Sequence, residues 1–293
     1  MIFIVSGLMC MRLSAQEPEK TSDLLPGKPE KAGSGYSFTE GCSVAPDGSV
    51  YFTDQPNDRI WIWDEKTGIR LFKEGVERSN GTYFDPKGNL LACADLYNQL
   101  VKFTPTGKMV TLLREGYKGK HFNGPNDLWQ DNKGGIYFTD PYYQRDYWEK
   151  GHQKMQDAEG VYYLSPKGKL KRVLGGTGQP NGIVGSKDGK WLYIADIRQS
   201  SILKCAILPD GSLGEATRFA PVGSDGMTID DEGNIYVTWG KVLIFNKEGQ
   251  KTGEIELPES PSNICFGGKD RKTLFITART SVYTVRMNAK GIE

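Results

Sequence analysis

Apolar and polar residues alternate along this chain in short runs, which are separated by turns rich in glycine, asparagine and aspartate. Alternation with a period of two predicts β-strands, because successive side chains of a strand point to opposite faces of its sheet. Such strands are expected at residues 48–53, 59–64, 99–104, 160–165, 201–205 and 241–246. No ten-residue stretch has helical periodicity. The pattern therefore predicts an all-β protein.

One sequence motif recurs six times: a polar residue, a turn containing glycine, and an apolar strand that ends in Thr-Asp or Ala-Asp. The clearest copy runs from Ser43 to Asp54, and a degenerate sixth copy lies near Lys269. The turn glycines of the other copies are Gly48, Gly88, Gly134, Gly189 and Gly233, separated by 40, 46, 55 and 44 residues. This period is typical of one four-stranded propeller blade. The fold class predicted is a six-bladed β-propeller with four-stranded blades.

The length of the chain leaves room for one such domain. Six blades of roughly 44 residues fill most of the 293 residues, and we assign residues 36–293 to the propeller and 17–35 to a linker. Residues 1–16 are apolar and end in small and polar residues, which is typical of a signal peptide. We therefore expect export to the periplasm or secretion. The alternative is a disordered N-terminus that precedes the true start.

Charge and cysteine usage narrow the choice of partner. Lys and Arg number 37 against 36 Asp and Glu, so no strong field favours a nucleic acid. No membrane span is expected, and the protein should be a monomer or a small homo-oligomer that acts on a small molecule. Cys42, Cys93, Cys205 and Cys265 stand singly in different blades, which indicates buried free thiols.

An oxygen-bearing residue precedes each strand pair, beside a small residue. These residues are Glu40, Asn80, Asn126, Asn181, Asp225 and Asn263. Because equivalent positions of a closed ring converge on its axis, we expect them to meet there. Glu40, Asn126, Asn181 and Asp225 offer carboxylate and carboxamide oxygens, the hard ligands that suit Ca²⁺. The alternative is that they only cap strand starts and bond one another.

Other residues are candidates for the pocket around this ring. Asn80, His121, Asp140 and Tyr142 are expected to bind substrate, together with Asn126. His121 could equally be structural, and Asp140 closes a strand as other aspartates do. Residues 141–159 contain four aromatic side chains and several charges, which predicts either a lid beside the channel mouth or a surface excursion packed on the rim.

Several motifs together resemble the gluconolactonase/regucalcin (senescence marker protein) family of calcium-dependent six-bladed propellers. The motifs are Thr39-Glu-Gly41, Gly124-Pro-Asn-Asp-Leu128, Gln179-Pro-Asn-Gly-Ile183 and Ser224-Asp-Gly-Met-Thr-Ile-Asp230, within a similarity that runs from about Phe38 to Thr284. The resemblance implies that Glu40, Asn126, Asn181 and Asp225 bind the metal and that Asp225 is the proton acceptor. In the animal branch of the family an arginine binds the sugar acid, and the corresponding residue here is Gly124. The resemblance therefore predicts the substrate of this protein less well than its metal site.

The function expected is calcium-dependent hydrolysis of a lactone, with an aldonolactone as first guess. The metal would polarise the carbonyl while Asp225 acts as general base, or attacks directly as a nucleophile. Mg²⁺, Mn²⁺ or Zn²⁺ could replace Ca²⁺. One alternative is an organophosphate or phosphotriester hydrolase that uses the same metal site. The other is a non-catalytic binding module, against which the joint presence of Glu40 and Asp225 argues.

Overall fold

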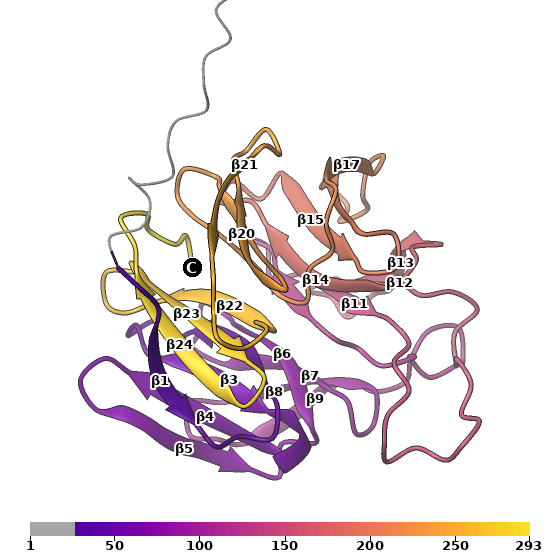
Figure 1. Cartoon of the computed structure of the whole chain (residues 1–293). Coiled ribbons are helices and arrows are strands. Elements are labelled where there is room, and N and C mark those ends of the chain that lie inside the picture. Colours follow the sequence, from indigo (N-terminus) through magenta and orange to yellow (C-terminus); the bar gives the residue numbers. More distant parts are fainter. Residues whose placement is uncertain (1–26) are drawn as a thin grey trace, which may run out of the picture.

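The protein is a ring of six four-stranded antiparallel sheets, as seen in the computed structural model, which describes residues 27–293 (Figure 1). The first blade comprises β2 (Thr39–Val44), β3 (Val50–Asp54), β4 (Arg59–Asp64) and β5 (Gly68–Glu74). The second comprises β6 (Ser79–Phe84), β7 (Leu90–Ala94), β8 (Gln99–Phe103) and β9 (Met109–Leu113). The third comprises β10 (Leu128–Gln130), β11 (Ile136–Asp140), β12 (Gly160–Leu164) and β13 (Leu170–Gly175). The sheets confirm the predicted six-bladed propeller.

The last three blades complete the ring. The fourth blade comprises β14 (Pro180–Gly185), β15 (Trp191–Asp196), β16 (Ser201–Ala206) and β17 (Thr217–Ala220). The fifth comprises β18 (Met227–Ile229), β19 (Ile235–Trp239), β20 (Lys241–Phe245) and β21 (Lys251–Ile255). The sixth comprises β22 (Asn263–Gly267), β23 (Thr273–Ala278), β24 (Ser281–Arg286) and β1 (Glu30–Ser34). The only helix in residues 27–293 is the short 3₁₀ turn η2 (Gln55–Asn57). No helix of this part of the chain has the length and apolar character needed to cross a bilayer.

The ring is closed by pairing between the two ends of the described chain. Strand β1, drawn in indigo, runs antiparallel to the yellow β24 and forms the outer edge of the sixth blade (Figure 1). Glu30 lies opposite Thr284 and Ser34 opposite Ser281. The propeller therefore begins within the segment expected to be a linker, residues 17–35. The proposed signal peptide, residues 1–16, lies outside the described residues.

The hydrophobic core is divided into six layers, one between each pair of neighbouring blades. Phe52 of the first blade packs against Phe275 of the last, with ring centroids 5.5 Å apart. Tyr51 packs edge to face on Phe84 of the second blade at 4.9 Å. Since each blade buries both faces, apolar packing lies between the blades and the axis is left to polar residues. The four blade cysteines are buried and free, as expected.

Candidate active site

Bulges in the inner strands direct polar side chains to the axis. The register of β2 against β3 shifts between Glu40 and Ser43, and similar shifts occur in β6 and β14 beside Asn80 and Asn181. A bulge inserts a residue without a ladder partner and re-aims the neighbouring side chain. The same local irregularity in three blades therefore presents Glu40, Asn80 and Asn181 to one space.

Asn126 and Asp225 reach the axis from positions just before their inner strands. The backbone N–H of Asn126 donates to Thr139 O at 2.9 Å, and that of Asp225 donates to Thr238 O at 3.1 Å. Pairing with the second strand thus continues past the assigned ends of β10 and β18. This pairing fixes both side chains at the same level of the ring as those held by bulges.

Glycine after the axial residue lets adjacent inner strands approach closely. A Cβ atom on Gly41 would lie 1.8 Å from the carbonyl oxygen of Asn80, and one on Gly182 would lie 2.7 Å from that of Asp225. Gly41 also has φ of +48°, in the left-handed region. Any side chain at Gly41 or Gly182 would push neighbouring blades apart at the axis, so these glycines are needed for the polar residues to converge.

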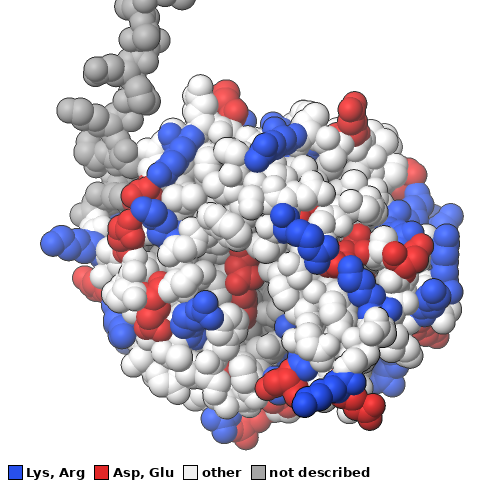
Figure 2. Space-filling view, turned by 45° about the vertical axis from the view of Figure 1, so that its right-hand side comes forward, with Lys and Arg blue, Asp and Glu red and all other residues white. Residues whose placement is uncertain are grey.

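These axial residues line a cavity of about 540 Å³. Its walls are formed by Phe38, Glu40, Gln55, Asn80, Asn126, Tyr143, Arg145, Asn181, Ile197, Asp225, Thr238, Trp239, Gly240, Ser260 and Pro261. Figure 2 shows a hollow near the middle of one face with acidic side chains in it, while the basic and acidic residues around that face are interspersed. The structure therefore brings together five sequence-predicted residues: Glu40, Asn80, Asn126, Asn181 and Asp225.

The two carboxylates are tied into the ring by amide groups. Asn181 Nδ2 donates to Asp225 Oδ1 at 2.8 Å and lies 2.9 Å from the hydroxyl of Tyr143. Asn263 Nδ2 donates to Glu40 Oε2 at 3.2 Å, and the backbone N–H of Gly41 donates to the same oxygen at 2.9 Å. Each carboxylate therefore has a fixed orientation.

Both carboxyl groups are poorly placed to remain ionised without a counter-charge. Burial, and next the nearby Asp225 carboxylate, raise the pKa of Glu40 well above its usual range. Burial raises the pKa of Asp225 to about 6, although the hydrogen bond from Asn181 opposes that shift. Two acids whose charged forms are both disfavoured by burial are the electrostatic setting that a cation relieves.

The donor set fits a hard divalent cation. The side-chain oxygens of Asn80 and Asn181 are buried and have no hydrogen-bond partner among residues 27–293, which is costly unless something binds them. No group of three or more His, Cys, Asp or Glu side chains could hold a metal within that range. A cation at the axis would therefore combine Glu40 and Asp225 with amide oxygens, including that of Asn126, a set that suits Ca²⁺ better than Zn²⁺.

His121 and Tyr142 do not line the cavity. The His121 side chain is exposed, and its carbonyl oxygen accepts a hydrogen bond from Gln156 Nε2 at 2.8 Å. The hydroxyl of Tyr142 lies 2.5 Å from the carbonyl oxygen of His152 within the same loop. Both residues stabilise the 141–159 segment and its surroundings, rather than presenting a group to the axis.

Asp140 is also absent from the cavity wall. It is fully buried, and its carboxylate accepts the backbone N–H groups of Gly124 at 2.8 Å and Asn123 at 3.1 Å. Burial raises its pKa to about 7, with the two N–H groups acting in the opposite direction. Asp140 thus orders the loop that leads to Asn126, which makes it a positioning residue.

Ten of the fifteen residues that line the cavity were not predicted from the sequence, among them Phe38, Gln55, Tyr143, Arg145 and Trp239. Tyr143 and Arg145 come from the 141–159 loop, so this loop lies at the cavity, as the first of its two interpretations supposed. The loop's aromatic content was the available signal. Irregular backbone has no fixed side-chain period, so the sequence did not indicate which of its residues face inward.

Comparisons with known proteins agree on one family. A family model described as the SMP-30/Gluconolactonase/LRE-like region matches residues 38–280. A gluconolactonase from Zymomonas mobilis is 30% identical over 292 residues, which cover 89% of this chain and 82% of that protein.

Solved structures extend this likeness. A gluconolactonase from Xanthomonas campestris superposes with a TM-score of 0.85 at 24% identity, covering 92% of this chain and 93% of that one. A calcium-binding regucalcin from Agrobacterium tumefaciens gives 0.74 at 18% identity, with 91% and 95% covered. Both similarities concern the propeller fold itself.

Proposed function

Because the chain belongs to the SMP-30/gluconolactonase/LRE-like family, we propose that it hydrolyses lactones at the axial cavity with the help of one divalent cation, Ca²⁺ in the first instance. The single observation that carries this proposal is that two buried carboxylates, Glu40 and Asp225, share an open cavity with carboxamide oxygens that have no hydrogen-bond partner among residues 27–293. The names of the Zymomonas and Xanthomonas relatives support the substrate class. The regucalcin neighbour supports the choice of cation.

Some of the axial residues bind the cation, and another transfers a proton. When bound, the cation supplies a Lewis acid for the lactone carbonyl. Glu40, held by Asn263 and Gly41, provides a fixed anionic ligand. Asn126 lies at the cavity wall, where its amide can contact both cation and substrate.

Asp225 is the group placed to move a proton. Its Oδ1 is oriented by Asn181 Nδ2 at 2.8 Å, and a carboxylate held in this way can accept a proton from water as a general base. Asp225 takes a proton from water as the water oxygen bonds to the acyl carbon. The ring C–O bond breaks, and the leaving oxygen takes the proton back from Asp225, which restores the carboxylate and yields the hydroxy acid. Direct attack by the Asp225 carboxylate is the alternative role for the same group.

Turnover tests the proposal directly. Purified full-length protein should open D-glucono-1,5-lactone and other lactones in a pH-stat assay, lose this activity in chelator, and regain it with added Ca²⁺. Mg²⁺, Mn²⁺ and Zn²⁺ should be compared at equal concentration. Hydrolysis of a phosphotriester faster than of any lactone would instead favour the organophosphate hydrolase. Binding without turnover of either class would favour a non-catalytic module.

Export remains part of the proposal. It rests on the apolar residues 1–16 alone. Fractionation of cells expressing the tagged full chain should recover it, shortened at its N-terminus, outside the cytoplasm. Recovery of the intact chain in the cytoplasm would contradict export.

A further inference from the structure

An aspartate follows the apolar run of the second strand in four successive blades. In three of them it accepts backbone N–H groups of the segment that leads to the inner strand: Asp54 from Ser37 and Phe38, Asp140 from Asn123 and Gly124, and Asp196 from Gly178 and Gln179. These three carboxylates stabilise the repeat itself. Asp95, the equivalent residue of the second blade, makes different contacts.

The Asp95 carboxylate is fully buried and is bound by side chains from outside its blade. Gln55 Nε2 donates to Oδ2 at 3.1 Å, and the hydroxyl of Tyr147 donates to Oδ2 at 2.7 Å. Arg145 Nη2 donates to Oδ1 at 3.1 Å, and Arg145 Nε lies 2.8 Å from Oδ2. Gly124 keeps this side of Asp95 open, because a Cβ there would lie 3.3 Å from Oδ1.

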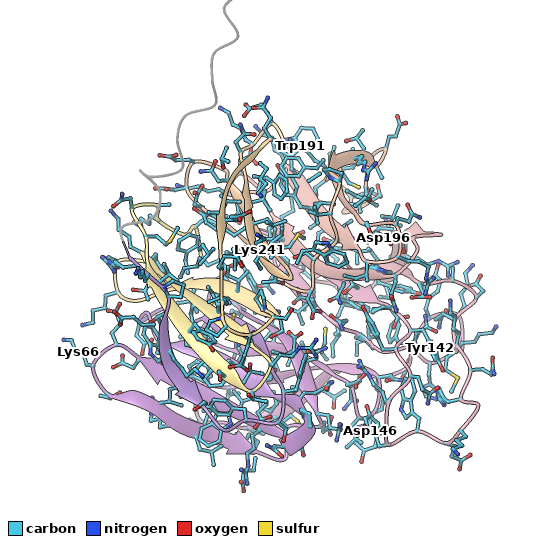
Figure 3. All side chains as sticks on the ribbon, in the orientation of Figure 1. Lys66, Tyr142, Asp146, Trp191, Asp196 and Lys241 are labelled. Atoms are coloured by element: carbon cyan, nitrogen blue, oxygen red, sulfur yellow. The ribbon has the colours of Figure 1, made fainter. Side chains whose placement is uncertain are left out.

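These contacts dock the 141–159 loop on the second blade. The guanidinium of Arg78 lies 4.3 Å from the centre of the Tyr147 ring, and Arg78 Nη2 lies 3.6 Å from Asp146. Figure 3 shows Tyr142 and Asp146 on this loop, beyond the ends of the strands. Because Asp95 is buried in the second blade, its contacts with Arg145 fix the position of Arg145 relative to the axis.

Arg145 is held so that part of its guanidinium faces the cavity. None of its contacts within residues 27–293 uses Nη1, its side chain is 17% exposed, and it lines the axial cavity. Arg145 therefore offers a hydrogen-bond donor near the reacting groups.

The cavity wall combines hydrogen-bonding residues with apolar ones. Gln55, Asn80 and Arg145 come from the first and second blades and the loop docked on them, and all are hydrogen-bonding residues. Ile197, Trp239 and Pro261 belong to the fourth blade, the fifth blade and the connection to the sixth, and they are apolar. A ring that carries hydroxyl groups matches such a mixed wall, with its hydroxyls toward Asn80 and Arg145 and its carbon face against Trp239.

We propose that Arg145 is the residue by which this cavity selects a polyhydroxylated lactone over a plain one, and that Asp95 is its positioning residue. This inference rests on the proposed function and names its substrate class. Arg145 is already ion-paired with Asp95, so it presents N–H donors with little net charge. A neutral polyol therefore fits this side better than an anionic sugar derivative.

The test compares substrates within each variant. We expect Arg145→Gln to lower the ratio of kcat/KM for D-glucono-1,5-lactone to that for δ-valerolactone by about 10- to 100-fold, the range for loss of a charged hydrogen bond. The loss should appear mainly in KM. Asp95→Asn should reduce the same ratio while Arg145 is intact, and Arg145→Lys should restore part of it.

Arg172→Gln is the matched control. Arg172 also pairs with an aspartate of the loop, Asp157, at 2.5 Å, but does not line the cavity. This variant should keep the wild-type ratio. An unchanged ratio in Arg145→Gln, or an equal fall in the control, would overturn the proposal.

A binding measurement separates this inference from the proposed function. By calorimetry, wild-type protein should bind 1,5-anhydroglucitol, a cyclic polyol with no carbonyl, and Arg145→Gln and Arg145→Lys should weaken that binding while Arg172→Gln does not. Arg145-dependent binding without lactone turnover would refute the proposed lactonase activity but support the role of Arg145 in polyol binding. Lactone turnover with Arg145-independent binding would refute the role of Arg145 alone. If variant Arg145→Gln fails to fold, Arg145→Lys decides.

Discussion

The strand-end aspartates and the axial polar residues are both repeated from blade to blade, yet they differ in how well their oxygens are satisfied. Asp140 and Asp196 each accept two or more backbone N–H groups. At the axis, burial and the Asp225 carboxylate disfavour the charged form of Glu40, and the Asn181 oxygen has no partner within residues 27–293. A repeated polar group that the fold satisfies stabilises the fold, whereas one left unsatisfied at a cavity is available to a ligand.

Asp95 is a third case, a strand-end aspartate whose carboxylate is satisfied by side chains instead of by the backbone of its own repeat. In the second blade, the loop before the inner strand is held by a different carboxylate. Asp58 accepts the N–H groups of Val76 at 3.1 Å and Arg78 at 2.6 Å. Because Asp58 supplies the structural hydrogen bonds, Asp95 can bind Arg145 and Tyr147 without loss to the repeat.

The largest expected effect concerns the axial base. Asp225→Asn keeps the shape of the side chain but removes its charge and its capacity to accept a proton. We expect kcat to fall by about 10²- to 10⁴-fold at saturating Ca²⁺. Asn181→Ala, which chiefly removes one ligand, should regain much of its rate at high Ca²⁺. Full turnover by metal-loaded Asp225→Asn would rule out the general-base role.

A strand-end residue should instead affect stability. Asp140→Ala leaves two buried backbone N–H groups without an acceptor, so we expect the free energy of unfolding to fall by about 2–5 kcal/mol. Chemical denaturation measures this loss. Asp64→Ala, at a turn where the carboxylate is exposed, is the control and should cost about 1 kcal/mol or less. Equal losses at the two positions would remove the distinction between them.

Removal of the cation should depend on pH. Without metal, the pKa of Asp225 is about 6 in the folded protein, so its carboxyl group keeps a proton below that pH. In the unfolded chain the pKa of this carboxyl group is nearer its usual, lower value. This contribution to stability is present at low pH and is lost as pH rises through about 6. Ca²⁺ must displace the Asp225 proton at pH 5 but not at pH 8, whereas a proton on Glu40, whose pKa is also raised, must be displaced wherever that group is protonated.

The rise in Tm on adding Ca²⁺ should therefore be larger at pH 8 than at pH 5. At a hundredfold excess over Kd, the gain at pH 8 should approach about 2.7 kcal/mol, or several degrees. Differential scanning calorimetry with and without chelator measures it, and Asp225→Asn should reduce the difference between the two pH values. Identical shifts at both pH values would show that the axial acids do not bind the ion.

The local pattern determined the repeating unit. Strands predicted at 59–64 and 241–246 form as β4 (Arg59–Asp64) and β20 (Lys241–Phe245). The axial positions of Glu40, Asn126, Asn181 and Asp225 followed from the repeat alone, because identical blades in a ring must place equivalent residues around one axis. This inference needed no knowledge of packing.

The pocket could be predicted only in part. Asn80 lines the cavity as expected, whereas His121, Asp140 and Tyr142 do not. Asp140 matched the pattern of a polar residue at a strand end, but backbone N–H groups already occupy its carboxylate. Sequence shows that a polar residue is present, and only the structure shows whether its bonding capacity is already used.

What the sequence by itself determined is the blade, its glycine turns and the axial ring, since each depends on contacts within a repeat or on the symmetry between repeats. The tertiary structure alone decided that β1 closes the ring against β24 and that Asp95 draws Arg145 to the cavity. Strand β1 meets its partner across about 250 residues, and Asp95 and Arg145 meet across 50. Such contacts depend on how the blades pack against one another, and nothing in the local alternation of apolar and polar residues encodes them.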